Sequence, residues 1–427
     1  MQIHVVRPGE TLYGIARQYG VSVTLLGRLN QVPAGGALAV GQTLVVYEPE
    51  RVHVVRPGET LEGIARREGV SVLSLYQNNY FLGGRSRILP DEELIVALKG
   101  EKSGTLGVNG YAYTFIRQEQ LRTVLPYITY LTPFTYGVTS QGGLVVPDDG
   151  PLLSAAPQYG AQLWMHLSTL TDSGSFDSRL GGALLENETA QKALIDAVAA
   201  NMAGKGYQGL DVDYEYLEGR QAAAYTAFID ALRQRLNPLG WPVIVALAPK
   251  SSAEQRGLLY EAHDYAALSH AANAVLLMTY EWGYTAGPPM AVAPLPQVRR
   301  VLDYALTEMA PEKIFLGVPT YGYDWPLPFR QGITRAPSLS PQEALALARR
   351  YGAEIQYDET AQSPWFRYTA ETGTVHEVWF EDARSSLAKL RLAADNGLQG
   401  VGLWNLMRDA PQTYLVLNGA FQVEKLA

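Results

Sequence analysis

The first hundred residues contain the same pattern of hydrophobic and polar positions twice. Residues 4–23 return at residues 53–72, and both copies open on His-Val-Val-Arg-Pro-Gly-Glu-Thr-Leu. A repeat at a fixed spacing predicts a repeated structural unit. The apolar opening predicts a strand, the Pro-Gly pair a turn, and Thr11 the cap of a helix with one apolar face. A second helical pattern and a closing apolar strand follow, so residues 1–48 and 51–98 are each predicted to fold as a βααβ unit.

From residue 105 onward, eight short apolar segments alternate with stretches of helical spacing. Such alternation predicts parallel strands joined by helices, and a stretch of about 320 residues has the size of a TIM barrel with insertions. We therefore expect an α/β fold for residues 105–427, a (β/α)8 TIM barrel preceded by the two βααβ units. The expected strands are residues 109–114, 130–136, 161–167, 209–216, 242–248, 273–280, 314–321 and 400–405.

Two segments fall outside this pattern. The gap between the seventh and eighth expected strands is about 80 residues, which is too long for one crossover connection. It predicts a small α+β insertion at about residues 323–379. The second segment, residues 99–104, is short, polar and contains glycine, so we expect a hinge between the repeat and the barrel.

Composition and charge narrow the classes of partner. The chain of 427 residues has a net charge of −8, and its first 100 residues are nearly neutral, so the acidic charge belongs to the predicted barrel. An acidic domain disfavours nucleic acid and anionic membranes as partners. No apolar run is long enough to insert into a membrane, and the N-terminus lacks the pattern of a signal peptide. The absence of cysteine excludes disulfides, thiolate metal sites and a cysteine nucleophile.

Three acidic residues alternate along the fourth expected strand, which reads Gly-Leu-Asp-Val-Asp-Tyr-Glu-Tyr. Because alternate side chains of a strand share a face, Asp211, Asp213 and Glu215 are expected to point into the barrel. Glu215 would lie at the C-terminal end of the strand, where such barrels have their active sites. Neighbouring acids share protons, which raises the pKa of at least one and suits it to general acid catalysis. A solvated acidic edge or a cation site is the alternative interpretation.

This strand resembles the DxxDxDxE signature of glycoside hydrolase family 18, the chitinase-like family. Asp211, Asp213 and Glu215 match its last three acids, whereas the first acidic position falls on Gln208. That position is remote from the chemistry in the family. The departure is therefore expected to change the local charge and to leave activity in place.

Further motifs agree with this resemblance. Met278 and Tyr280 match the MxY motif of the family on the sixth strand, and Trp404 matches the tryptophan that forms the floor of the sugar site. Tyr111 lies on the first strand, where the family places an aromatic residue. The family often has aspartate after the tyrosine of the MxY motif, whereas this chain has Glu281. The resemblance implies substrate contacts for Met278, Trp404, Tyr111 and Glu281, and it leaves the role of Glu281 open.

The N-terminal repeat resembles the LysM module, a family that binds N-acetylglucosamine-containing glycans such as chitin or peptidoglycan. The sequence Arg-Pro-Gly-Glu-Thr-Leu and an asparagine in the second helix carry the resemblance. It implies that Asn30 and Asn78 match the characteristic asparagine of the family and contact the sugar. Two modules in tandem would add avidity. The second copy has a longer loop at residues 80–87, so the sugar affinity of the two copies is expected to differ.

The order of the domains and the segments 278–283 and 379–385 resemble the spore-cortex hydrolases, germination proteins with two LysM modules before a family 18 barrel. The resemblance implies a sporulation protein that acts on the peptidoglycan of the spore cortex. It further implies synthesis in the mother cell and a place at the spore surface, cortex or coat, or otherwise in the cell wall. We expect the protein to be a monomer.

Family 18 enzymes are retaining glycosidases in which the substrate assists its own cleavage. The resemblance implies that Glu215 protonates the leaving oxygen while the 2-acetamido group of the substrate attacks the anomeric carbon. Asp213 would hold the acetamido N–H, supported by Asp211, and Tyr280 would donate a hydrogen bond to the acetamido oxygen. This chemistry requires an N-acetyl sugar in the substrate. It requires no cofactor and no metal ion.

Two other functions compete with an N-acetylglucosaminidase of the cortex. A catalytically weak, chitinase-like glycan-binding protein would use the same barrel, but such proteins usually lack the catalytic glutamate that is present here as Glu215. A chitinase acting on chitin oligosaccharides would need the same barrel motifs. The LysM pair and the segments of the sporulation type favour peptidoglycan over chitin.

Overall fold

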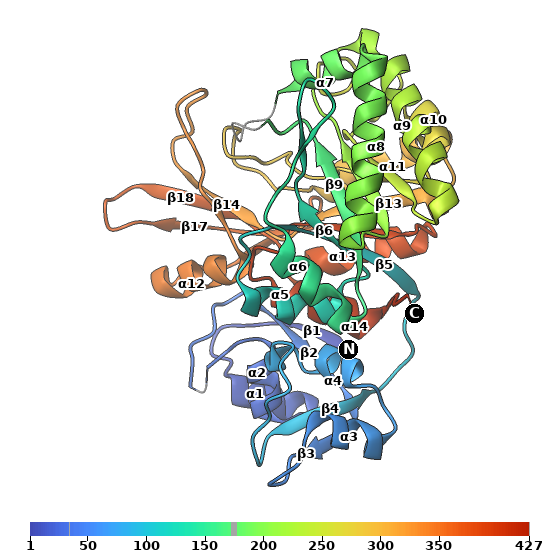
Figure 1. Cartoon of the computed structure of the whole chain (residues 1–427). Coiled ribbons are helices and arrows are strands. Elements are labelled where there is room, and N and C mark those ends of the chain that lie inside the picture. The colour runs from blue at the N-terminus through green and yellow to red at the C-terminus, as the bar shows by residue number, and fades with distance from the viewer. Residues whose placement is uncertain (34, 172–176, 427) are drawn as a thin grey trace.

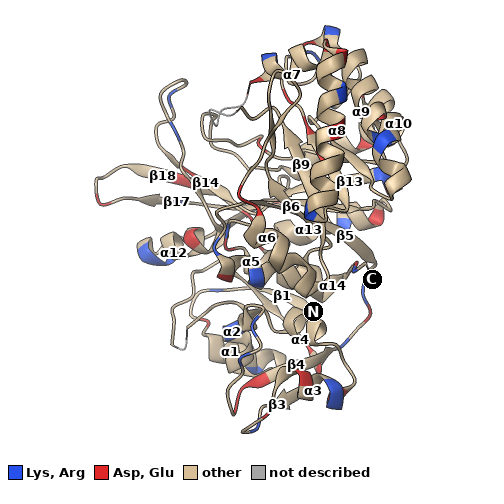
Figure 2. Cartoon of the chain, in the orientation of Figure 1, with Lys and Arg blue, Asp and Glu red and all other residues tan. Residues whose placement is uncertain are grey.

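The computed structural model describes residues 1–33, 35–171 and 177–426. Two small N-terminal domains pack against one side of a large barrel, and a small sheet projects from the barrel next to them (Figure 1). In the same orientation, basic and acidic side chains are interspersed over both parts of the chain (Figure 2). Among the described residues, no helix combines the length and the apolar character needed to cross a membrane.

The first domain is a βααβ unit. Its elements are β1 (Gln2–Val5), α1 (Leu12–Tyr19), α2 (Val23–Leu29) and β2 (Thr43–Val46), and the two strands pair antiparallel. Thr11 caps α1 as expected, because its hydroxyl accepts a hydrogen bond of 3.1 Å from the backbone N–H of Gly14. Gly20 ends the helix with a φ of 66°, a left-handed conformation that glycine adopts without strain.

The second domain repeats this fold with one addition. Its elements are β3 (Pro49–Val54), α3 (Leu61–Glu68), α4 (Val72–Asn78), the short 3-10 helix η1 (Tyr80–Leu82) and β4 (Glu93–Leu98). Thr60 caps α3 in the same way as Thr11 caps α1. The addition, η1, occupies the longer loop. Phe81 of this helix lies against the first domain, where the guanidinium of Arg28 is 3.8 Å from the centroid of its ring.

Eight parallel strands form a closed barrel, because the last strand pairs with the first. They are β5 (Thr105–Tyr113), β6 (Tyr130–Phe134), β9 (Gln162–Ser168), β10 (Gly209–Asp213), β11 (Val243–Leu247), β12 (Ala274–Leu277), β13 (Ile314–Pro319) and β19 (Gly400–Trp404). Each overlaps one of the expected strands. The predicted (β/α)8 barrel is therefore confirmed.

Helices surround the barrel on the outside (Figure 1). They are α5 (Gln118–Val124), α6 (Gly150–Ala155), α7 (Ser178–Leu185), α8 (Glu188–Lys205), α9 (Ala222–Leu236), α10 (Tyr265–Ala271), α11 (Leu295–Glu308), α13 (Ala383–Asp395) and α14 (Pro411–Ala420). Short elements complete the connections: β7 (Gly137–Val138), β8 (Leu144–Val145), β20 (Gln422–Val423), η2 (Leu125–Tyr127), η3 (Ala156–Tyr159), η4 (Gly219–Gln221), η5 (Asn237–Leu239) and η6 (Pro311–Lys313).

Aromatic side chains fill the barrel interior near the N-terminal ends of its strands. The rings of Tyr130 and Trp164 stack with their centroids 3.8 Å apart, and Phe315 meets both rings edge-on. All three side chains are buried. Because this end of the barrel is packed, a ligand can enter only at the C-terminal ends of the strands.

A small α+β subdomain is inserted between β13 and β19, as the long gap predicts. Its elements are β14 (Gly322–Pro326), β15 (Ser338–Leu339), α12 (Pro341–Tyr351), β16 (Gln356–Asp358), β17 (Ser363–Thr369) and β18 (Val375–Trp379). The strands form one sheet in the order β15-β14-β18-β17-β16. Helix α12 belongs to the same apolar cluster as Phe366 and Val378, so it covers one face of the sheet.

Buried polar contacts hold the N-terminal domains against the barrel. The hydroxyl of Thr43 on β2 donates a hydrogen bond of 2.6 Å to Gln412 of α14. The linker, residues 99–104, is also fixed to the barrel, because the backbone N–H of Ser103 donates a hydrogen bond of 2.7 Å to the carbonyl of Ala420. The expectation of a hinge at residues 99–104 is therefore wrong. A polar, glycine-containing sequence is compatible with a flexible linker, but here its backbone pairs with the end of α14.

Candidate active site

Three carboxyl groups follow one another along β10 toward the open end of the barrel. Asp211 is fully buried, and Asp213 ends the strand with its side chain only 11% exposed. Glu215 lies in the loop that follows and is half-buried. Tyr214, between them, faces outward, because its ring stacks parallel to that of Tyr225 on α9. The acidic side chains therefore share the inner face, as their alternation predicts.

Asp211 is held in place from the opposite side of the barrel interior. The hydroxyl of Tyr111 on β5 donates a hydrogen bond of 2.5 Å to Asp211 Oδ2 and accepts one of 2.9 Å from Asn109 Nδ2. Thr132 on β6 in turn donates to Asn109 Oδ1 at 2.6 Å. Tyr111 is only 2% exposed, so it lies beneath the site. From this position Tyr111 can orient Asp211, but it is too deeply buried to contact a substrate.

Burial and mutual repulsion raise the pKa values of these acids. Burial raises the pKa of Asp211 to about 6, although the hydrogen bond from Tyr111 acts in the opposite direction. Burial and then the charges of Glu215 and Asp211 raise the pKa of Asp213 well above its ordinary value. Burial also raises the pKa of Glu215. A raised pKa favours the protonated carboxyl group, which is the form that a general acid requires.

Asp213 lies beside a histidine that stays neutral. His166 Nε2 is 3.7 Å from Asp213 Oδ2, and His166 Nδ1 is 2.6 Å from the hydroxyl of Thr135. Burial lowers the pKa of His166 to about 3, so it adds no positive charge. Within the described part of the chain, Asp213 Oδ1 is buried and has no hydrogen-bond partner. Buried polar atoms are normally paired, so this oxygen is available to a polar group of a substrate.

Aromatic rings form a floor around Trp404, at the end of β19. The ring of Tyr280 is nearly parallel to the indole, with an angle of 14° and centroids 6.5 Å apart. Phe134 meets the indole edge-on at 5.0 Å, and Met278 packs against the same apolar cluster as Trp404. Trp404 is half-buried, so part of its surface stays accessible. A flat apolar ring with an accessible surface suits the stacking of a sugar.

Tyr280 connects this floor to the acids. Burial and then the charges of Asp213 and Glu215 raise the pKa of its hydroxyl well above the ordinary value. The hydroxyl therefore stays protonated and can donate a hydrogen bond to a ligand. The structure thus brings the expected residues Asp213, Glu215, Tyr280 and Trp404 to one end of the barrel.

Glu281 is held by two tyrosines that sequence reasoning did not identify. The hydroxyls of Tyr321 and Tyr323 both donate to Glu281 Oε1, the second at 3.0 Å. Glu281 itself has a φ of 66°, which turns the chain sharply after Tyr280. A signal was present in the sequence, because Tyr321 and Tyr323 alternate just beyond the seventh strand. The site therefore extends from the acids of β10 to the inserted subdomain.

Gln208, the position that departs from the acidic signature, lies at the closed end of the barrel just before β10. Its backbone N–H donates to the carbonyl of Leu163 at 2.7 Å, and its Oε1 accepts from the N–H of Leu163 at 3.2 Å. The side chain thus bridges two neighbouring strands. It is separated from Glu215 by the length of β10.

Asn30 and Asn78, expected to contact sugar, are buried inside the N-terminal domains. Asn30 Nδ2 donates to the carbonyl of Val45 at 2.8 Å, and its Oδ1 accepts from the N–H of the same residue at 2.7 Å. In the second domain this pair of bonds belongs to Asn79, which binds Ile95. The match of Asn78 to Asn30 is therefore wrong by one residue. Asn30 and Asn79 use their side chains to stabilise the fold.

Two family descriptions match this chain. Residues 170–409 match glycosyl hydrolases family 18, and residues 4–46 and 53–97 each match the LysM domain. The family 18 match spans β10, β12 and β19 and the residues that follow them, and so includes the three acids, Tyr280 and Trp404.

Similar proteins match all or most of the chain. The cortical fragment-lytic enzyme of Bacillus subtilis is 40% identical over 434 residues, with 100% of this chain and 99% of that protein covered. The crystal structure of the Bacillus megaterium spore cortex-lytic enzyme SleL has a TM-score of 0.85 at 35% identity and covers 100% of this chain and 99% of that one. A chitinase from Chromobacterium violaceum has a TM-score of 0.68 at 26% identity and covers 74% of this chain and 98% of that one.

Proposed function

The chain belongs to glycosyl hydrolases family 18 and carries two LysM domains, and on this premise we propose that it is a retaining N-acetylglucosaminidase of spore-cortex peptidoglycan. The observation that carries the proposal is the row of acids that ends in Asp213 and Glu215, with Tyr280 and Trp404 next to it. Each of these four side chains has its own task in the cleavage of an N-acetyl glycoside.

In the first step Glu215 donates its proton to the glycosidic oxygen, and the bond between this oxygen and the anomeric carbon breaks. The carbonyl oxygen of the 2-acetamido group of the substrate attacks the anomeric carbon and closes an oxazolinium ring. Asp213 accepts the N–H of that group and balances its positive charge, while Asp211 supports Asp213 from below. Tyr280 donates a hydrogen bond to the acetamido oxygen, and the sugar ring stacks on the indole of Trp404.

In the second step the carboxylate of Glu215 takes a proton from a water molecule, whose oxygen attacks the anomeric carbon. The carbon–oxygen bond of the oxazolinium ring breaks, the acetamido group is restored, and Glu215 regains its proton. Two successive inversions give retention of configuration. An intramolecular attack replaces a bimolecular one, which can lower the barrier by roughly 7–11 kcal/mol.

The state of Asp213 supports assistance by the substrate. Most retaining glycosidases use a second carboxylate as nucleophile, and family 18 is an exception. The pKa of Asp213 lies well above its ordinary value because the group is buried and close to Glu215 and Asp211. A carboxyl group that shares a proton with a neighbouring acid is a weak nucleophile, so the acetamido group takes this role. As the shared proton passes to Asp211, the anion left on Asp213 balances the positive charge of the intermediate.

The choice of cortex peptidoglycan rests on the extent of the similarities. The cortical fragment-lytic enzyme of Bacillus subtilis matches 100% of this chain, including both LysM domains, whereas the Chromobacterium violaceum chitinase covers 74%. LysM domains that bind peptidoglycan would keep the enzyme at the cortex or in the cell wall, where its substrate is.

The experiment is digestion of purified cortex fragments and of N-acetylglucosamine oligomers by the full chain and by Glu215→Gln. We expect cortex products that end in reducing N-acetylglucosamine, formed first as the β-anomer, and a rate lower by a factor of about 10²–10⁴ in the variant. Glu312→Gln, on η6 at the closed end of the barrel, is the matched control. Products that end in reducing muramic acid, or faster cleavage of the oligomers, would contradict the proposal.

A further inference from the structure

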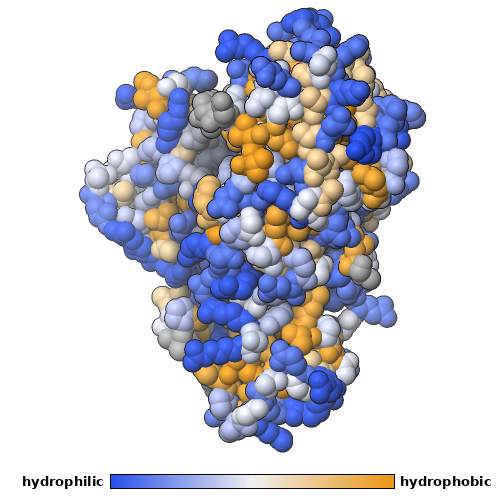
Figure 3. All heavy atoms as spheres, in the orientation of Figure 1, coloured by the Kyte–Doolittle hydropathy of each residue, from blue (hydrophilic) through white to orange (hydrophobic). Residues whose placement is uncertain are grey.

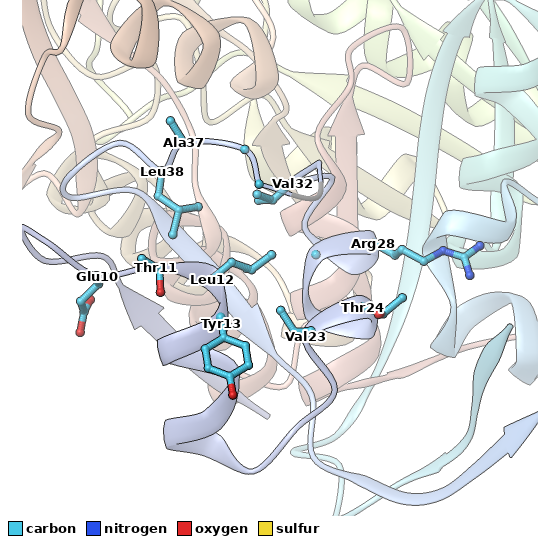
Figure 4. Close-up of a pocket in the computed structure, with 13 residues that line it drawn as sticks. Glu10, Thr11, Leu12, Tyr13, Val23, Thr24, Arg28, Val32, Ala37 and Leu38 are labelled. Carbon is cyan, nitrogen blue, oxygen red and sulfur yellow. The ribbon is translucent and has the colours of Figure 1, made fainter. Parts of the chain in front are cut away.

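The first LysM domain has a groove of about 520 Å³ between the start of α1 and the end of α2 (Figure 4). Gly27 lies at its base, and Leu12 and Val32 line it. A Cβ atom at Gly27 would be 3.1 Å from Leu12 Cδ2 and 3.0 Å from the carbonyl oxygen of Val32. Because residue 27 has no side chain, Leu12 and Val32 approach its backbone closely, and a larger side chain at this position would require them to shift.

The rim of this groove combines apolar and polar groups. Tyr13 is 67% exposed at the start of α1, and Thr24 and Glu10 add polar groups around the opening. Apolar side chains also gather on the surface near α1 and α2 (Figure 3). An apolar base with hydrogen-bonding groups at its edge suits a pyranose ring, which has apolar faces and polar edges.

The corresponding place in the second LysM domain is filled. Tyr76 stands where the first domain has Gly27, and it packs into the same apolar cluster as Leu61. Leu61 is completely buried, whereas its counterpart Leu12 is half-buried. The ring of Tyr76 lies next to that of Tyr159 of the barrel, with their centroids 5.9 Å apart. Tyr76 therefore packs between the apolar cluster of the second domain and the barrel.

The barrel covers the same region of the second domain from outside. The hydroxyl of Tyr127 donates to the carbonyl of Gln77 at 2.9 Å, and Gln77 Nε2 donates to the carbonyl of Pro126 at 2.8 Å. The loop that corresponds to the groove rim is fixed as well, because Tyr159 donates to the carbonyl of Gly84 at 2.6 Å. Helix α4 and the loop after it thus pack against the barrel.

We propose that the first LysM domain alone holds the glycan strand and that the second is a rigid bridge between it and the barrel. This inference rests on the proposed function. Arg28 connects the two domains, since it lies over Phe81 and forms an ion pair of 2.9 Å with Glu92. The groove therefore keeps a fixed position relative to Glu215. The avidity expected from two modules in tandem is replaced by a single anchor of fixed geometry.

The test is binding of the full chain to insoluble peptidoglycan in a pelleting assay, with Glu215→Gln as the parent so that the ligand is not digested. Gly27→Tyr gives the first domain the residue of the second, and Tyr13→Ala removes an exposed side chain of the rim. We expect the dissociation constant to rise at least tenfold for Gly27→Tyr and severalfold for Tyr13→Ala. Glu62→Ala, at the position that corresponds to Tyr13, is the matched control and is expected to change it less than twofold.

The outcomes separate this inference from the proposed function. A parent that does not bind peptidoglycan overturns both the proposed wall binding and this inference. A parent that binds, with binding unchanged in Tyr13→Ala or reduced equally by Glu62→Ala, overturns only the division between the domains. Thermal unfolding of each variant shows whether it is folded. If Gly27→Tyr does not fold, Tyr13→Ala still tests the inference.

Discussion

The hydroxyl of Tyr111 and the carboxylate of Asp211 are joined by a hydrogen bond of 2.5 Å across the barrel interior, although the residues are 100 positions apart in the chain. This bond lowers the pKa of Asp211, against burial, which raises it to about 6. The charge on Asp211 in turn raises the pKa of Asp213. Tyr111 on the first strand therefore influences the acids on the fourth.

Tyr111→Phe is expected to lower kcat about tenfold and to leave KM nearly unchanged, because Tyr111 lies beneath the site. Loss of the donor raises the pKa of Asp211 above about 6 and leaves a buried oxygen unpaired, which costs about 1–3 kcal/mol of stability. The measurements are the pH profile of kcat and thermal unfolding. Tyr113→Phe, on the same strand, is the control, and an equal shift of the pH profile in that variant would contradict the coupling.

Asp211→Asn is expected to remove part of the pH dependence of stability. The pKa of Asp211 is raised from 3.8 to about 6 in the folded state, so its stabilising contribution is complete below about pH 4 and is lost as pH rises through 6. Asparagine accepts the same hydrogen bond and does not ionise. The variant should therefore match the parent at pH 4 and exceed it at pH 7, by about 3 kcal/mol at most. Thermal unfolding at both values is the measurement, and an equal difference at pH 4 and pH 7 would rule out this explanation.

The double variant Tyr321→Phe/Tyr323→Phe is expected to raise KM roughly tenfold. The two hydroxyls orient Glu281 and lower its pKa, in opposition to burial, which raises it. Without them Glu281 loses two hydrogen bonds, each worth about 0.5–1.5 kcal/mol. KM and kcat on soluble cortex fragments are the measurements, with Glu281→Gln for comparison. Unchanged KM and kcat in the double variant would show that Glu281 does not contribute to substrate binding.

Lys389→Met is expected to destabilise the protein by about 3–5 kcal/mol. Lys389 Nζ lies 2.9 Å from Glu381 Oε2, and the two side chains are 0% and 2% exposed. The single variant leaves a buried charge without its partner, whereas Lys389→Met/Glu381→Leu removes both charges and should recover most of the loss. Thermal unfolding of the two variants measures this. Equal losses in both would show that packing, and not the unpaired charge, is responsible.

The sequence alone determined the order of the domains, the barrel strands and the inner face of β10. These features depend on local patterns, since a strand covered on both faces needs a continuous apolar run and alternate side chains share one face. Asp211, Asp213 and Glu215 could be placed on one face for this reason. The two repeats also differ at the position that is Gly27 in the first copy and Tyr76 in the second. Only the structure shows that this position lies at a groove.

Only the tertiary structure decided which distant side chains meet. Two hydrogen bonds join residues that are far apart in the chain: that from Tyr111 to Asp211 and that from Tyr321 to Glu281. The segment at residues 99–104 has the composition of a hinge, yet it is fixed because its hydrogen-bond partners lie on α14. Local patterns describe which residues of one element are apolar or polar. They contain no information about the surface that will pack against that element, and this surface determines burial, pKa and access to a ligand.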